Sequence, residues 1–173
     1  RLRCSMESRI STENRRCAPP LFLDSRTMDR LKLMALDAED LAVISAQVQD
    51  AVTKSEAIDY RSREKRFTLM INRFAWDQVD NTARSGKNYE RRQAVLSFAR
   101  VQNVRTKDIR RDGDEVLSLL AIRFEETDAP AGRIELVFAD GPLIHLEVEC
   151  VEAQMEDLGA AWETRFKPRH PAN

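Results

Sequence analysis

The chain has 173 residues, of which 33% are charged and 42% hydrophobic, with a formal net charge of −1. That length suits one domain of ordinary size, and a charge near zero gives no general attraction to nucleic acid or anionic lipid. No apolar run approaches the roughly 18 residues that a membrane helix needs, and no apolar segment of a secretory signal follows the basic start. We therefore expect a cytoplasmic globular domain with no membrane association.

The cysteines favour a reduced compartment. They are Cys4, Cys17 and Cys150, an odd number with two members in the N-terminal segment, which does not make a disulfide framework. Cys150 falls on the apolar side of its predicted strand, as is typical of a small buried thiol.

Residues 1–27 differ from the rest of the chain. They carry six arginines against three acidic residues, contain Pro19-Pro20 and show no sustained helical or strand period. We predict a disordered or non-native upstream tail, with a transit-peptide-like segment and a partner-binding basic tail as alternatives. A single α+β domain is predicted over residues 28–166, and residues 167–173 are predicted to fray.

The first half of this domain shows strand and helix signals. A short strand is predicted over 31–35, and Asp37 is predicted to cap an amphipathic helix over 38–53. A second short strand over 58–61 leads into a basic turn. From Phe67 the apolar residues alternate but then change parity, so we predict a β-bulge near Asn72-Arg73 that brings Phe74 and Trp76 to the same face.

The second half shows mainly strand signals. Residues 77–91 are polar and predict a connection, after which 94–98 resume the strand pattern, extended irregularly by Val101 and Val104. Residues 115–125 are apolar on both sides, which predicts a central strand covered twice. After Cys150 the period changes to that of a helix. The predicted helical face comprises Val151, Met155, Leu158 and Trp162.

A β-hairpin over 132–150 is the clearest prediction. Two alternating segments flank Asp140-Gly141, and a three-residue loop Ala139–Gly141 places apolar residues opposite one another. The predicted apolar pairs are Ile134 with Leu146 and Leu136 with Ile144. The predicted outer pairs are Arg133 with Glu147 and Glu135 with His145, which bring opposite charges together when the histidine is protonated.

The order of elements predicts an α+β domain. The strands are expected to form an antiparallel meander that curls into a roll or half-open barrel, with one N-terminal and one C-terminal helix. Such a roll is pleckstrin-homology-like by analogy of fold alone.

Six short segments resemble a bacterial, alphaproteobacterial-type family known as the domain of unknown function DUF2948. They are Met28-Asp-Arg-Leu-Lys-Leu, Glu64-Lys-Arg-Phe67, Ile71-Asn-Arg-Phe-Ala-Trp76, Leu117-Ser-Leu-Leu120, Leu146-Glu-Val-Glu-Cys-Val-Glu-Ala153 and Asp157-Leu-Gly-Ala-Ala-Trp162. The resemblance covers about residues 28–170 and supports a start at Met28. It implies no activity, cofactor or catalytic residue.

Motifs of catalysis and cofactor binding are missing from the sequence. The five glycines are widely spaced, which excludes a phosphate-binding glycine-rich loop, and no C-x-x-C, H-E-x-x-H or G-x-S-x-G string occurs. His145, Glu147 and Glu149 share one strand face and could hold a metal ion or supply a general base. The predicted hairpin register instead gives His145 and Glu147 ordinary cross-strand partners. We predict no cofactor and no metal.

Two basic clusters are the predicted ligand-binding residues. If the strands around Phe67 and Leu96 are consecutive and antiparallel, both clusters lie at one end of the sheet, where they could bind an anionic ligand or an acidic protein. Solvated turns are the competing interpretation. The clusters comprise Arg61, Arg63, Lys65, Arg66, Arg105, Lys107, Arg110 and Arg111.

These observations predict a non-catalytic binding or adaptor module for a protein or an anionic ligand. The alternative is a small metal-assisted enzyme that uses the strand face of His145, Glu147 and Glu149. Nucleic acid is not an expected partner, because aromatic residues are not interleaved with the basic ones. The oligomeric state stays open.

Overall fold

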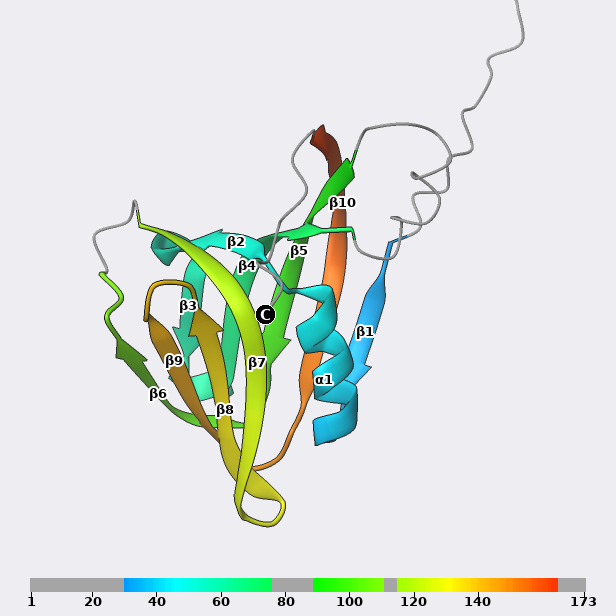
Figure 1. Cartoon of the computed structure of the whole chain (residues 1–173). Coiled ribbons are helices and arrows are strands. Elements are labelled where there is room, and N and C mark those ends of the chain that lie inside the picture. Colours follow the sequence, from blue (N-terminus) through cyan, green and yellow to red (C-terminus); the bar gives the residue numbers. More distant parts are fainter. Residues whose placement is uncertain (1–29, 76–88, 111–114, 165–173) are drawn as a thin grey trace, which may run out of the picture.

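The computed structural model describes residues 30–75, 89–110 and 115–164, which form one curved antiparallel sheet and, within those ranges, a single α-helix (Figure 1). The strand order is β1-β10-β5-β4-β2-β7-β8-β9-β6, and β3 pairs with β4. The elements are β1 (Lys32–Ala35), α1 (Ala38–Gln47), β2 (Ala51–Lys54), η1 (Ser55–Ala57), β3 (Ile58–Arg61), η2 (Ser62–Glu64), β4 (Arg66–Phe74), β5 (Tyr89–Phe98), β6 (Val101–Lys107), β7 (Val116–Asp128), β8 (Ala131–Phe138), β9 (Leu143–Val148) and β10 (Ala153–Thr164).

Helix α1 begins where the sequence predicts. The Asp37 side chain accepts a hydrogen bond from the Asp40 backbone N–H at 2.8 Å, which satisfies one of the free donors of the first turn. The predicted end at residue 53 is wrong, because Asp50 adopts a φ of 60° and its N–H donates to the Leu119 carbonyl at 2.8 Å. From Ala51 the chain pairs with β7, so sheet hydrogen bonds replace helical ones.

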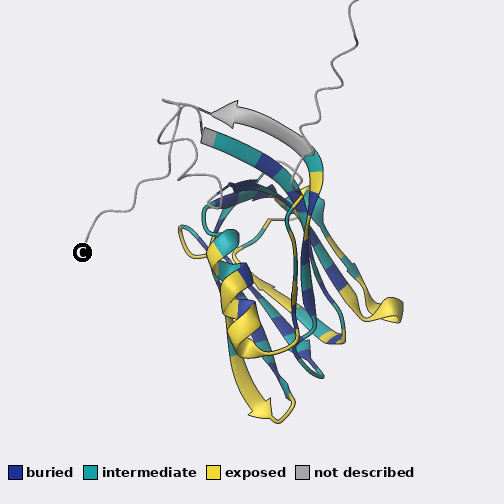
Figure 2. Ribbon diagram, turned by 90° about the vertical axis from the view of Figure 1, so that its right-hand side faces the viewer, coloured by how far each residue is buried: buried dark blue, intermediate teal, exposed yellow. Residues whose placement is uncertain are grey.

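The core lies inside the curve of the sheet. Helix α1 buries Leu41 and Ile44 against β1 and β7, while its outer surface is exposed (Figure 2). Alternate residues of β8 and β9 point to the same core, as the period of a half-buried strand requires. No helix within the described ranges is long and apolar enough to cross a membrane.

The predicted hairpin is confirmed as β8 and β9. Ile134 pairs with Leu146, Leu136 with Ile144, and on the outer face Glu135 pairs with His145. Asp140 and Gly141 both take positive φ angles in the three-residue turn, at 64° and 110°. The loop therefore provides the left-handed conformation that a bulged hairpin turn needs.

The bulge predicted near Asn72-Arg73 is wrong. Strands β4 and β5 pair in continuous register from Phe67 opposite Phe98 to Phe74 opposite Arg91. Arg73 therefore lies on the same face of β4 as Phe67, and its side chain is buried. Phe74 is buried on the other face. Trp76 lies outside the described residues.

The predicted C-terminal helix is wrong as well. Residues 153–164 form β10, which inserts between β1 and β5 and pairs with both. Its buried side chains Ala153, Met155 and Asp157 occupy every second position, as in a strand. Because Asp157 is charged, a pattern based on apolar residues alone did not show this alternation. Pairing on both sides satisfies backbone groups that a short helix would leave free.

The prediction that β7 is covered on both faces holds for one face only. Val116 and Leu120 are 62% and 38% exposed, whereas Leu117 and Leu119 are buried. A register shift between Leu119 and Ala121 in the pairing with β8 then turns Ile122 inward. The predicted central position is confirmed, since β7 lies between β2 and β8.

The sheet curls but does not close into a barrel. Its path ends at β1 and at β6, and no ladder joins β6 to β3 among the described strands. The prediction of a mostly antiparallel, curved β domain is confirmed. The C-terminal helix on which the pleckstrin-homology analogy depended is absent from residues 153–164, because this segment forms β10.

Candidate functional site

The gap where the sheet fails to close, between β3 and β6, is the candidate functional site; we call it the seam. One end of the seam is tied together. The Tyr60 hydroxyl donates to the Gln102 carbonyl at 3.1 Å and to the Val101 carbonyl at 3.3 Å, and the Val101 N–H donates to the Lys65 carbonyl at 2.9 Å. Beyond these bonds the two strands separate.

A pocket of about 480 Å³ occupies the open part of the seam. That volume falls within the range of roughly 300–1,000 Å³ that small-molecule sites span. Apolar and polar side chains share its wall in similar measure. The lining residues are Ser55, Glu56, Ile58, Tyr60, Phe67, Val104, Thr106, Ile109 and Arg110.

Strand alternation explains this lining. Ile58 and Tyr60 of β3 turn inward while Asp59 and Arg61 turn to solvent, as successive side chains of a strand must. On β6, Val104 lines the pocket, and its neighbour Arg105 pairs with Glu147 on the outer face at 3.1 Å. The pocket thus lies between the inward-facing side chains of β3 and β6, two strands that do not pair with each other.

The polar groups of the pocket differ in how well they are satisfied. The Ser55 hydroxyl is buried and has no hydrogen-bond partner among the described residues, although the Ser55 N–H donates to the Glu115 carbonyl at 3.0 Å. Glu56 forms an ion pair with Lys54 at 3.4 Å. A buried hydroxyl without a partner is unfavourable, so Ser55 is the polar group most in need of a ligand atom.

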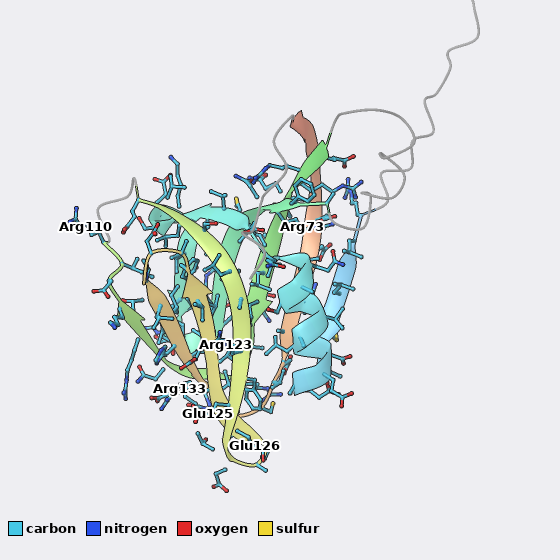
Figure 3. All side chains as sticks on the ribbon, in the orientation of Figure 1. Arg73, Arg110, Arg123, Glu125, Glu126 and Arg133 are labelled. Carbon is cyan, nitrogen blue, oxygen red and sulfur yellow. The ribbon has the colours of Figure 1, made fainter. Side chains whose placement is uncertain are left out.

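Arg110 lies at the mouth of the pocket, beyond the end of β6. Its backbone N–H donates to a Glu115 carboxylate oxygen at 2.8 Å, which fixes the chain there. Figure 3 shows the exposed Arg110 side chain at the edge of the molecule, far from Arg73 in the interior.

The structure does not gather the eight predicted basic residues on one rim. Strand β5 ends at Phe98, Arg100 takes a φ of 59°, and β6 then pairs with β9 instead of continuing β5. Strand β6 therefore leads away from η2 (Figure 1). Arg61, Arg63, Lys65 and Arg66 lie around η2, Arg105, Lys107 and Arg110 follow β6, and Arg111 lies outside the described residues.

Several of these cations already have acidic partners. Arg61 pairs with Asp59 at 3.0 Å, and this hydrogen bond together with nearby Glu64 raises the pKa of Arg61. Lys65 pairs with Glu149 at 2.7 Å, and this bond lowers the pKa of the Glu149 carboxyl. Of the eight predicted residues, Arg110 lines the seam pocket, and Arg66 lines a smaller pocket of about 90 Å³ elsewhere on the sheet.

The strand face of His145, Glu147 and Glu149 is engaged in cross-strand pairs. His145 Nε2 lies 3.6 Å from Glu135 Oε1, Glu147 pairs with Arg105, and Glu149 pairs with Lys65. Within the described ranges no group of three or more His, Cys, Asp or Glu side chains is placed to hold a metal ion.

A buried ion cluster is the other unusual feature, and the sequence did not predict it. Arg73 Nε and Nη2 donate to the two Asp157 carboxylate oxygens at 2.8 and 2.9 Å, and both side chains are at most 1% exposed. Arg92 and the Leu31 N–H also contact Asp157, at 3.5 and 3.2 Å. Burial alone raises the pKa of Asp157, but the hydrogen bonds and charge of Arg73, together with the Leu31 N–H and Arg92, hold that pKa below its ordinary value. The cluster ties β4, β5 and β10 together and is closed to solvent.

The pocket residues themselves were interpreted in the sequence as strand or turn positions. One signal was available: Ile109 is an isolated apolar residue within the charged segment Lys107–Arg111, and it packs against the core instead of facing solvent. The convergence of η1, β3 and β6 depends on long-range pairing, which no local pattern reports.

The fold and the pocket define a small, curved β-sheet domain with a ligand-sized opening between β3 and β6. The chain belongs to the family described as Protein of unknown function (DUF2948), whose model matches residues 31–170. The predicted resemblance is thereby confirmed. No curated protein and no solved structure matches the chain.

Proposed function

We propose that this protein is a non-catalytic binding module whose ligand occupies the seam pocket. The observation that carries the proposal is the pocket itself: a ligand-sized cavity with a partly apolar wall, a buried hydroxyl that finds no partner among the described residues, and a cation at its mouth. Binding sites for small molecules combine these features, with an apolar wall for affinity and a few polar groups for orientation.

The pocket favours an anionic ligand over a protein partner. Of the four surface cations around η2, Arg61 and Lys65 are paired with acidic residues, and ion pairs at solvent-exposed positions contribute little free energy. The pocket offers a concave apolar wall that those cations do not. An anionic ligand with an apolar portion therefore fits better than a flat acidic protein surface.

The metal-assisted enzyme has no observation in its favour. His145 and Glu147 have cross-strand partners on the outer sheet face, and Glu149, just after β9, is paired with Lys65. A binding role needs none of these groups to change its partner.

Filling the pocket tests the proposal. Thr106 lines the pocket but is exposed, so Thr106→Trp should fold while blocking the cavity. We expect the neutral dye Nile red to bind the wild type with increased emission and to lose most of that binding in Thr106→Trp. The matched control is Val116→Trp, a bulky substitution at an exposed position outside the pocket. Equal dye binding by wild type and Thr106→Trp would contradict the proposal.

A further inference from the structure

We infer that the ligand of the seam pocket is an amphipathic monocarboxylate, with an apolar chain or ring inside the pocket and its carboxylate at the mouth. This inference rests on the proposed function and adds the chemical class of the ligand. Three features carry it: the apolar wall, the cation at the mouth and the limited number of positive charges there.

The apolar body is specified by the pocket wall. Ile58 and Tyr60 come from β3, Phe67 from β4, and Val104 from β6, so apolar surface surrounds the cavity on several sides. Phe67 is fully buried, which places the floor of the pocket on the domain core. A ligand chain there leaves water for an apolar environment, and that transfer is favourable in proportion to the buried area.

The carboxylate is specified by Arg110. No hydrogen bond or ion pair joins its guanidinium to an acidic side chain within the described ranges, in contrast to Arg61 and Arg105. The guanidinium has parallel N–H donors that match the two oxygens of a carboxylate. Its backbone is held at the mouth by Glu115, and its long side chain can fold back over a bound ligand.

Ser55 supplies a second donor. Its hydroxyl has no partner among the described residues, and rotation about the Cα–Cβ bond moves it between staggered positions on the pocket wall. A ligand oxygen that accepts from this hydroxyl removes the cost of a buried polar group without a partner. Arg110 at the mouth and Ser55 on the pocket wall thus both offer donors to a ligand.

The charge balance favours a monoanion over a phosphate. The Glu115 carboxylate lies beside the Arg110 backbone, so the mouth already holds negative charge, whereas Glu56 of the same pocket is paired with Lys54. Arg105 is paired with Glu147 on the outer face of β6 and is not a pocket residue. Among the described residues at the mouth, the Arg110 guanidinium balances one ligand charge, whereas the second charge of a dianion would meet repulsion from Glu115.

A set of ligands with one chain length and different head groups tests the inference. Isothermal titration of the full chain with octanoate, octanol and octyl phosphate compares a carboxylate, a neutral head and a phosphate. We expect octanoate to bind most tightly and Arg110→Gln to weaken it by about threefold to tenfold while leaving octanol unchanged. Lys107→Gln, which removes an exposed cation outside the pocket lining, should leave all three affinities unchanged.

The outcomes separate this inference from the proposed function. Equal binding of octanoate and octanol, unaffected by Arg110→Gln, would overturn the carboxylate and leave the binding module standing. Tightest binding of octyl phosphate would also overturn it. If none of the three binds while Nile red still depends on the open pocket, the ligand class is wrong but the pocket is a binding site. If Nile red binding does not depend on the pocket either, both proposals fail.

Discussion

At the scale of single residues, Arg73 and Asp157 form the most consequential pair of the molecule. A guanidinium and a carboxylate without water must satisfy each other, and the two hydrogen bonds at 2.8 and 2.9 Å do so. Removing the Asp157 carboxylate takes from the buried Arg73 its bidentate anionic partner, and its longer contacts with Gln47 and the Phe74 carbonyl do not carry a full negative charge. The pair therefore makes stability sensitive to a change of a single atom.

We predict that Asp157→Asn lowers the free energy of unfolding by about 3–5 kcal/mol, because Arg73 would stay charged and buried. Urea denaturation followed by circular dichroism measures this loss. The control is Glu156→Gln, which removes an exposed pair with Lys32 on the neighbouring position and should cost less than about 1 kcal/mol. Similar losses in the two variants would contradict the role of the buried cluster.

The Asp157 carboxyl also makes the stability of the folded protein depend on pH. The pKa of Asp157 is lowered in the folded protein, so the folded state binds its proton less readily than the unfolded chain does. Its contribution to stability is therefore complete above the unfolded pKa of about 3.9 and is lost as the pH falls through the lower folded value.

The advantage of the wild type over Asp157→Asn should accordingly shrink as the pH falls below about 4, since only the wild type has this carboxyl to protonate. Urea midpoints measured for both proteins across that range give the difference directly. Other carboxyls titrate in both proteins and cancel in the comparison. A difference that stays constant down to the lowest pH would show that Asp157 does not carry the effect.

The sequence contained part of this pair. Arg73 has the same parity as Phe67, Leu69 and Ile71, so a strand without a bulge would have placed it in the core. A buried arginine is rare enough that the apolar pattern favoured a bulge instead. The partner that makes its burial acceptable, Asp157, lies 84 residues away, and no local pattern could report it.

At the scale of elements, local signals succeeded and non-local ones failed. The N-cap at Asp37 and the turn at Asp140-Gly141 act over a few residues, and the structure confirms both. Strand β3 has the predicted bounds as well. In contrast, β10 was predicted as a helix, because its spacing of apolar residues suits a helix when the buried Asp157 is left out.

Two side chains on β10 distinguish a strand from the predicted helix. Met155 is fully buried and Leu158 is 43% exposed, whereas both would share the apolar face of a helix. We predict that Met155→Ala lowers the free energy of unfolding by about 2–5 kcal/mol and that Leu158→Ala costs less than about 1 kcal/mol. Chemical denaturation of both variants measures the two losses. Equal and large losses would favour the helix.

At the scale of the whole molecule, the failure of the sheet to close creates the candidate site. Strand β6 was predicted as an extension of β5, which would have closed this region differently. It instead crosses to pair with β9 and brings its inner face opposite β3. A pocket formed by strands whose pairing is set by distant residues cannot be predicted from the sequence of either strand.

The hydrogen bonds of Tyr60 hold the seam at its closed end, so their removal should loosen the seam locally. We predict that Tyr60→Phe lowers the free energy of unfolding by about 0.5–1.5 kcal/mol, because two carbonyls lose a shared donor. Amide hydrogen exchange locates the change, and the Val101 N–H that donates to Lys65 should exchange faster in the variant.

The ladder between β8 and β9 provides the internal control. Its amides, including that of Leu146 opposite Ile134, lie outside the seam and should keep their protection apart from the global loss of stability. Acceleration at Val101 beyond that global loss would show that the seam opens by itself. Uniform acceleration at Val101 and Leu146 would mean that Tyr60 stabilises the domain as a whole. The pocket would then open only when the domain unfolds, and a ligand would have to enter through its existing mouth beside Arg110.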